Sequence, residues 1–135
     1  MRRDVARRPS PPAISARQAD LLDGDATPTD LVVFNPPWIP GPVDTMLERA
    51  LNYEGDLFER FFDQAHGAVR PQGRVVLVFS NILRLVTPDA PHPIDAELER
   101  GRFTLSDKLT RRIRPPKGSG RRTKERVEVW SLAPA

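Results

Sequence analysis

The sequence contains no cysteine and only two histidines, His66 and His92, which lie far apart in the chain. Without thiols the protein has no disulfide bond, no thiolate metal site and no cysteine nucleophile, and a histidine-based metal site is not expected either. No apolar run approaches the length needed to cross a bilayer, and the basic, proline-containing start lacks the apolar core of a secretory signal. We therefore expect a cytoplasmic protein that uses no metal and does not enter a membrane.

The bulk composition is that of an ordinary globular chain. Its 135 residues, 39% hydrophobic and 29% charged, are enough for one domain with a single core. The net charge of +3 permits an anionic partner but does not demand one. Residues 1–12, rich in arginine and proline, are predicted to be disordered, and residues 13–135 are predicted to form the domain.

The central part of the sequence predicts a strand, a helix and a second strand. Two unbroken apolar stretches, 31–34 and 75–79, are typical of parallel strands that are buried on both faces. Between them, residues 56–69 carry apolar side chains on one helical face, and Asp56 followed by Glu59 predicts a capping box where the helix begins. This order implies a crossover connection, which places the two strands parallel in one sheet.

The flanking segments complete an α/β fold. Residues 43–55 have weak helical spacing, and a short helix is expected at 94–99. Two amphipathic stretches, 102–113 and 127–135, are joined by a basic flexible loop at 114–126. They predict an antiparallel hairpin at the edge of the sheet.

A chemically distinctive stretch, Asn35-Pro36-Pro37-Trp38, follows the first apolar strand. Ligands of open α/β sheets bind beyond the carboxyl ends of the strands, where Asn35 lies. The two prolines make a stiff turn without backbone donors, whose carbonyl groups are free to accept hydrogen bonds. The Asn35 amide adds a further acceptor, and Trp38 offers a flat face for stacking. This combination suits an amino group on a planar substrate.

The stretch "DLVVFNPPW", residues 30–38, resembles motif IV of the class I S-adenosylmethionine-dependent methyltransferases that methylate nitrogen. These include enzymes that methylate adenine amino groups in DNA and RNA, the methyltransferase small domains, and the HemK-like enzymes that methylate a glutamine of peptide release factors. The resemblance implies that Asn35 and the carbonyl of Pro36 accept hydrogen bonds from the target amino group and are the catalytic residues. It also implies that Pro37 and Trp38 bind the substrate, with the indole ring stacked on the acceptor.

The preceding segment carries a second part of the resemblance. Residues 16–24, "ARQADLLDG", resemble the segment after the third strand of this family. This implies that Asp20 receives the adenine amino group of the cofactor S-adenosyl-L-methionine, that the backbone N–H of Leu21 meets the adenine ring, and that Asn35 borders the cofactor. Residues 55–80 resemble the helix, turn and fifth strand that follow. The implied fold is a partial Rossmann-like class I methyltransferase sheet, with parallel strands 4 and 5 and a C-terminal antiparallel hairpin.

The glycine-rich turn that holds the cofactor in this family is missing from the sequence. None of the eight glycines follows an apolar strand and opens a helix. The first strands of the family sheet are therefore expected to be missing, which makes strand 31–34 an unpaired edge. A complementing N-terminal half, upstream or in a partner chain, would restore the site; otherwise the chain is a remnant. We expect the chain alone to bind S-adenosyl-L-methionine weakly or not at all.

The sequence leaves the acceptor and the basic loop open to more than one interpretation. The acceptor is a macromolecule: a base of RNA or DNA, or a protein glutamine. The arginines and lysines of residues 111–126 can grip phosphates, or they form a solvated hairpin loop, since no aromatic residues lie among them. Tyr53 can line the acceptor pocket, although packing is favoured, and His92 is expected in a turn or cap. The alternatives to an enzyme are a non-catalytic or remnant methyltransferase-like subunit and a basic nucleic-acid-binding module.

Overall fold

The computed structural model describes residues 13–23, 27–114, 117–118 and 124–135. The predicted disorder of residues 1–12 lies outside these ranges, as does part of the predicted basic loop. Within the described ranges, no helix is long and apolar enough to cross a membrane. The same ranges contain no group of three or more histidine, aspartate or glutamate side chains that could hold a metal ion.

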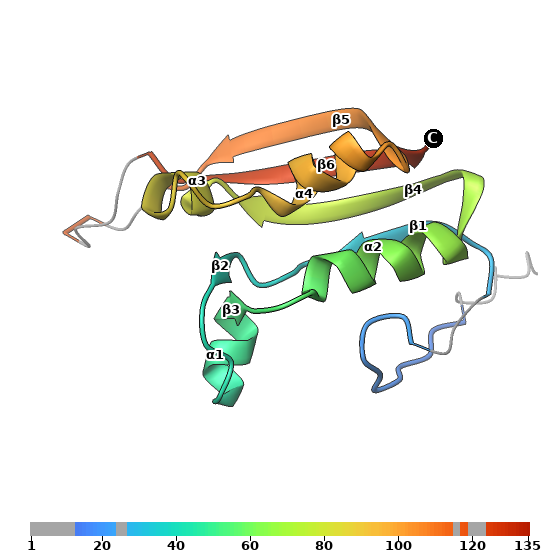
Figure 1. Cartoon of the computed structure of the whole chain (residues 1–135), viewed down its shortest axis with the longest axis horizontal. Helices are drawn as coiled ribbons and strands as arrows, with labels where there is room; N and C mark the ends of the chain where they lie inside the picture. The colour runs from blue at the N-terminus through green and yellow to red at the C-terminus, as the bar shows by residue number, and fades with distance from the viewer. Residues whose placement is uncertain (1–12, 24–26, 115–116, 119–123) are drawn as a thin grey trace, which may run out of the picture.

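A four-stranded sheet forms the centre of the structure (Figure 1). In spatial order its strands are β1 (Thr29–Phe34), β4 (Val69–Ser80), β6 (Arg126–Pro134) and β5 (Phe103–Arg112). Strands β1 and β4 run parallel, whereas β6 pairs antiparallel with both β4 and β5. The predicted parallel pair and the predicted C-terminal hairpin at the sheet edge are both confirmed.

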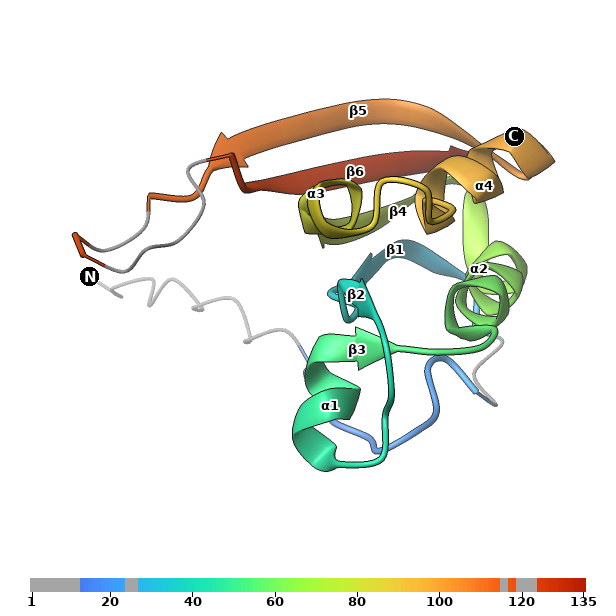
Figure 2. The same cartoon turned by 60° about the vertical axis from the view of Figure 1, so that its left-hand side comes forward.

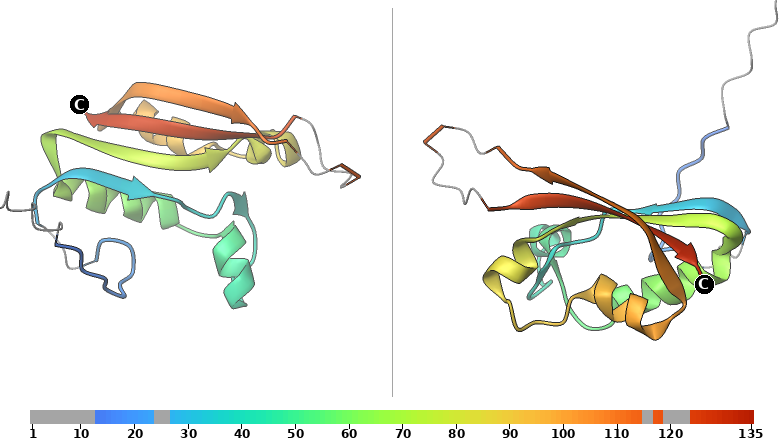
Figure 3. Two further views of the ribbon diagram at one scale, coloured as in Figure 1. Left: turned by 180° about the vertical axis from the view of Figure 1, so that it is seen from behind. Right: turned by 90° about the horizontal axis from the view of Figure 1, so that it is seen from above.

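Three helices cover one face of this sheet (Figure 3): α2 (Leu57–Ala68), α3 (Ile82–Val86) and α4 (Pro93–Arg100). The sheet residues that face the helices alternate along β4 and β6 and are buried: Val75, Leu77, Phe79, Trp130 and Leu132. The predicted apolar stripe of α2 packs against them through Phe58, Phe61, Phe62 and Ala65. One core therefore lies between a single sheet and a single layer of helices.

The predicted burial of the first strand on both faces is wrong. In β1 only Val32 is buried, at 5% exposure, whereas Leu31 is 55% exposed and Val33 is 62% exposed. The reason is that all three covering helices pack on the same face, so alternate residues of β1 point away from the core. Among the described residues, no strand pairs with the outer edge of β1, which agrees with the expected edge position.

The predicted capping box of α2 is also wrong. Asp56 does occupy the N-cap position, but its side chain caps no backbone N–H and instead accepts a hydrogen bond from Arg60 Nε at 3.0 Å. A capping box forms one helix earlier, at α1 (Met46–Leu51). There Thr45 Oγ1 accepts from the Glu48 N–H at 3.1 Å, and Glu48 Oε2 accepts from the Thr45 N–H at 2.8 Å.

Neighbouring valines in β1 test the one-sided burial. We expect Val32→Ala to lower the free energy of unfolding by about 2 kcal/mol, because it removes methyl groups from the core. Val33→Ala makes the same chemical change on the exposed face and is expected to change stability by less than about 0.5 kcal/mol. Urea unfolding followed by circular dichroism measures both. Equal losses in the two variants would mean that the outer face is covered.

His92 is the N-cap of α4, as expected for a cap residue. Its Nδ1 accepts a hydrogen bond from the Asp95 N–H at 3.3 Å, and its ring packs between Phe79 and Trp130. Burial lowers the pKa of His92 below its usual 6.5; among its charged neighbours, Arg84 and Lys108 lower it further, while Asp95 and Glu128 oppose the shift. The folded protein therefore holds this histidine neutral at a pH where the unfolded chain takes up a proton.

This difference predicts a loss of stability in mild acid. The contribution of His92 is complete above pH 6.5 and falls as the pH drops below that value, because protonation then favours the unfolded chain. We expect His92→Asn, which keeps a capping side chain, to reduce the loss of unfolding free energy between pH 8 and pH 5. Urea titrations across this range measure it. The control is His66→Asn, which removes the exposed histidine of α2; an equal reduction there would contradict the assignment.

Candidate functional site

The exit from β1 is fastened to the sheet by a tryptophan side chain. The last pair between β1 and β4 joins Phe34 to Leu77. One residue further along β4, the carbonyl of Val78 accepts a hydrogen bond from Trp38 Nε1 at 3.2 Å. Prolines have no N–H to continue the ladder, so the indole supplies a donor that Pro36 and Pro37 cannot. Trp38 thus holds the stiff exit in a fixed position.

Asn35 stands exposed at the start of this exit, while the next residue, Pro36, is buried. No hydrogen bond to the Asn35 side chain occurs among the described residues, so both its carbonyl oxygen and its amino group remain available to a ligand. The neighbouring Phe34 ring is fixed by stacking on Phe61, with centroids 4.1 Å apart. A rigid backbone therefore presents an unsatisfied amide at the carboxyl end of β1.

After this exit the chain forms α1 and then returns to the exit in a short strand, β3 (Figure 2). Two short strands, β2 (Ile39–Pro40) and β3 (Asn52–Tyr53), pair in parallel, and α1 connects one to the other along the chain. The Gly41 N–H donates to the Tyr53 carbonyl at 3.0 Å, which closes this connection. The Tyr53 ring meets Phe58 of α2 edge-on, at a centroid distance of 4.8 Å. Tyr53 is consequently placed beside the exit by contacts on two sides.

The segment before β1 docks on α2 as a tight turn. The Asp23 N–H donates to the Asp20 carbonyl at 3.0 Å, and the Leu22 N–H donates to Gln64 Oε1 at 2.8 Å. Arg60 Nη1 lies 2.8 Å from Asp20 Oδ2. Leu21 at the apex adopts a φ of 58°, a conformation that is uncommon for a residue with a side chain. The turn therefore has a defined position against the helix.

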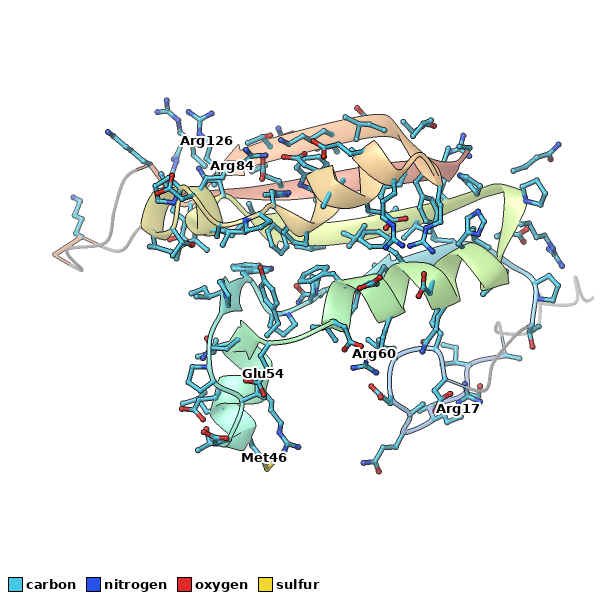
Figure 4. All side chains as sticks on the ribbon, in the orientation of Figure 1. Arg17, Met46, Glu54, Arg60, Arg84 and Arg126 are labelled. Carbon is cyan, nitrogen blue, oxygen red and sulfur yellow. The ribbon has the colours of Figure 1, made fainter. Side chains whose placement is uncertain are left out.

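These three segments and α2 enclose a pocket of about 570 Å³. This volume lies within the range of roughly 300–1,000 Å³ that is typical of ligand pockets. The lining combines apolar, aromatic and charged side chains: Asp20, Leu21, Phe34, Pro37, Val43, Arg49, Asn52, Tyr53, Glu54, Leu57 and Arg60. We call it the Tyr53 pocket. Figure 4 labels Glu54 and Arg60, which come to it from the end of β3 and from α2.

The charges around the Tyr53 pocket face solvent rather than the core. In the Asp20–Arg60 pair the two side chains are 67% and 40% exposed, so the pair contributes little to stability and remains open to competition by a ligand. Burial raises the pKa of the Tyr53 hydroxyl above its usual 10.0. At neutral pH the pocket therefore offers a neutral phenol, exposed carboxylates and guanidinium groups.

The structure brings only some of the predicted site residues together. Asp20, Leu21 and Pro37 line the Tyr53 pocket, although the first two are distant in sequence from the third. The lining does not include Asn35, Pro36 or Trp38, which lie on the exit segment that borders it. The roles assigned to these side chains stay predictions. In particular, the Trp38 indole N–H donates a hydrogen bond to β4, and its stacking on an acceptor stays a prediction.

Sequence reasoning missed the wall of the Tyr53 pocket that residues 43–57 form. The sequence favours packing of Tyr53 over a place in the acceptor pocket. In the structure Tyr53 does both, since it lines the pocket and packs on Phe58. Arg49, Asn52 and Glu54 were not foreseen. Strands of two residues are too short to show an alternating pattern, so the β2–β3 pair gave no signal in the sequence. The polar and aromatic run "NYE" was the only local sign.

Comparison with known structures identifies the fold. The chain is similar, over 80% of its length, to 44% of the chain in "crystal structure of M1.HpyAVI-SAM complex", with a TM-score of 0.50 and 17% identity. A second similar structure, "crystal structure of M1.HpyAVI", gives 0.48 and 16%, with coverage of 81% of this chain and 48% of that chain. No family model and no curated protein matches the sequence. The chain spans less than half of these structures and has an α/β, partial Rossmann-like methyltransferase fold.

Proposed function

We propose that the protein carries the acceptor side of an S-adenosyl-L-methionine-dependent N-methyltransferase. The observation that carries the proposal is the position of an exposed Asn35, whose side chain has no hydrogen-bond partner among the described residues, beside a pocket that gathers Asp20, Leu21, Phe34 and Pro37. In this function Asn35 and the Pro36 carbonyl accept hydrogen bonds from an amino group of a planar acceptor. They orient its nitrogen lone pair toward the pocket.

The residues of the Tyr53 pocket fit the adenosine end of the cofactor. Asp20 keeps acceptor sites free beyond its contact with Arg60, since a carboxylate offers about four lone-pair positions. The Leu21 N–H is available for a ring nitrogen, and Phe34 and Tyr53 offer aromatic faces. When bound, S-adenosyl-L-methionine supplies an electrophilic methyl group on a good leaving group.

The proposed reaction requires alignment more than it requires acid or base groups. Holding an amine and a methyl donor in line makes the displacement effectively unimolecular, which is the contribution of a rigid exit segment. The two prolines and the Trp38–Val78 hydrogen bond restrict the movement of Asn35 during this step. Water accepts the proton that the methylated amine releases.

The remainder of the cofactor site is proposed to come from a complementing segment. Among the described glycines, Gly41 and Gly55 each lie between a two-residue strand and a helix, but neither belongs to a glycine-rich turn, so the described residues offer no such turn for the methionine end of the cofactor. The free edge of β1 is the place where a further parallel strand could add to the sheet. A strand from an upstream or partner segment would extend the sheet there and complete the pocket wall.

We expect weak but localised cofactor binding by the chain. In a titration with S-adenosyl-L-methionine or adenosine, the amide signals of Leu21, Phe34 and Tyr53 should shift in nuclear magnetic resonance spectra, with a dissociation constant in the millimolar range. Tyr53→Ala should weaken these shifts, because it removes an aromatic wall of the pocket. Arg74→Ala, at the far end of β4, is the control. Shifts that appear only elsewhere would contradict the assignment of the pocket.

Asn35 tests the transfer step itself. With tritiated S-adenosyl-L-methionine at saturating concentration, we expect slow label transfer to DNA, RNA or a glutamine-containing peptide. Asn35→Ala should lower the rate about 100-fold, because the acceptor amine loses its orientation, while Asn35→Asp should keep part of it. Gln72→Ala removes an exposed amide from the opposite end of β4 and should have no effect. Absence of transfer to all three acceptors would contradict an enzymatic role for the chain without a complementing segment.

The second candidate function is that of a non-catalytic interaction domain. It is favoured by the free edge of β1 and by the exposed Leu31 and Val33 on the outer face of the sheet. Such a domain would stabilise a partner chain by strand addition, and Asn35 would have no role in binding an acceptor. The two functions differ in the response of methyl transfer to Asn35→Ala.

A further inference from the structure

A second cavity, of about 810 Å³, lies where α3 meets the β5–β6 hairpin. Five of its lining side chains are cationic and one is acidic: Arg84, Lys108, Arg112, Lys124, Arg126 and Glu128. We call it the basic pocket. Figure 4 shows Arg84 and Arg126 at this end of the sheet, projecting from α3 and β6.

Two of the five cations are neutralised by carboxylates. Lys108 Nζ lies 2.7 Å from Glu128 Oε2, and Arg84 Nη2 pairs with Asp95 of α4. The nearby Glu125 does not line the cavity, and it accepts a hydrogen bond from Ser80 Oγ at 3.4 Å. The basic pocket therefore contains more positive charge than its own carboxylates balance.

The other three cations have no acidic partner among the described residues: Arg112, Lys124 and Arg126. Arg112 and Arg126 are direct cross-strand partners in the β5–β6 ladder. Like charges that face each other across an antiparallel pair are destabilising. An anion placed between them would remove this repulsion, and guanidinium groups bind the oxygens of such an anion in pairs.

The backbone that carries these cations is fixed. Asn81, at the junction of β4 and α3, donates from its backbone N–H to the Arg126 carbonyl at 3.1 Å and accepts from the Arg126 N–H at 2.7 Å. Its Nδ2 donates to the Lys124 carbonyl at 3.0 Å. Three hydrogen bonds to one residue hold both basic positions against the sheet. The backbone at Lys124 and Arg126 is therefore tied to the junction of β4 and α3.

The basic pocket and Asn35 lie at the same end of the sheet, beyond the carboxyl ends of β1 and β4. Phe34, which precedes Asn35, pairs with Leu77, and Asn81 follows Leu77 by four residues on the parallel neighbour strand. At a rise of about 3.3 Å per residue, Asn81 lies roughly 13 Å beyond Phe34 along the strands, and β6 and β5 lie about 10 Å and 14 Å across the sheet from β1. A few nucleotides of a single strand cover these distances. A chain that presents a base to Asn35 can therefore place its backbone in the basic pocket.

We propose that the basic pocket binds the phosphodiester backbone of a nucleic acid beside the base that is presented to Asn35. The inference rests on the proposed function and narrows its acceptor to a base of DNA or RNA in preference to a protein glutamine. A phosphodiester chain delivers regularly spaced negative charges to Arg112, Lys124 and Arg126 whatever its sequence. A peptide would need acidic residues at each matching position.

Fluorescence anisotropy of the full chain with labelled oligonucleotides tests the proposal. The probes are a single-stranded DNA, an RNA and a duplex DNA of about 20 residues, together with a labelled polyglutamate peptide of the same length. The triple variant Arg112→Gln, Lys124→Gln, Arg126→Gln should bind nucleic acid at least 10-fold more weakly. The slope of log affinity against log salt should fall by about 2, since each phosphate contact contributes roughly 0.7–0.9.

The matched control is the triple variant Arg70→Gln, Arg74→Gln, Arg100→Gln. It removes the same charge from exposed positions of β4 and α4 that do not line the basic pocket, and it should change affinity less than 3-fold. Thermal unfolding checks that both variants are folded. Equal losses in the two variants, no loss in either, or polyglutamate binding as tight as that of nucleic acid would overturn the proposal.

Asn35→Ala separates this inference from the proposed function. The variant should keep the salt dependence and most of the affinity for the oligonucleotides, because Asn35 contributes one uncharged contact to the base and none to a phosphate, while methyl transfer falls. If oligonucleotide binding depends on the three cations but no acceptor is methylated, the basic pocket stands and the proposed function fails. If the glutamine peptide alone is methylated in an Asn35-dependent manner, the proposed function stands and the phosphodiester site is overturned.

Discussion

The architecture of the candidate site depends on the hydrogen bond between the Trp38 indole and the Val78 carbonyl. A strand that ends in two prolines gives up its backbone donors, and a chain leaving the sheet in this way would be free to swing. The indole N–H restores one donor at the next position of β4. The exit therefore leaves the ladder after Phe34 but is tied to β4 again at Trp38, three residues after the exposed Asn35.

The one-sided sheet has consequences for stability and for association. All the large aromatic residues of α2 are committed to one face, where they stack on Phe34 and meet Phe79 edge-on. The opposite face presents Leu31 and Val33 beside an edge with free backbone groups. Proteins usually pair, cover or charge such edges. A strand added there would pair the backbone of β1, whereas burial of Leu31 and Val33 would need an element packed on the outer face.

The two cavities at the carboxyl end of the parallel pair are lined by different kinds of side chain. The Tyr53 pocket mixes aromatic faces with charges of both signs, which suits a heterocycle that carries polar groups. The basic pocket gathers guanidinium and ammonium groups, three of them without an acidic partner among the described residues, which suit the oxygens of an extended polyanion. Asn35 follows β1 and Asn81 follows β4, so adjacent strands anchor the two sites. Their relative position is set by the strand register rather than by flexible loops.

Apolar periodicity and proline chemistry act locally, and for this reason the sequence predicts the parallel pair, the aromatic helix, the closing hairpin and the stiff exit after Phe34. Which faces are covered depends on tertiary packing, since an apolar strand such as 31–34 is compatible with burial on either side but does not say what packs there. Tertiary packing also decides that Arg60, rather than the helix N-terminus, takes the Asp56 carboxylate, and that Tyr53 returns to the exit. These outcomes depend on contacts between residues distant in sequence, which no local pattern encodes.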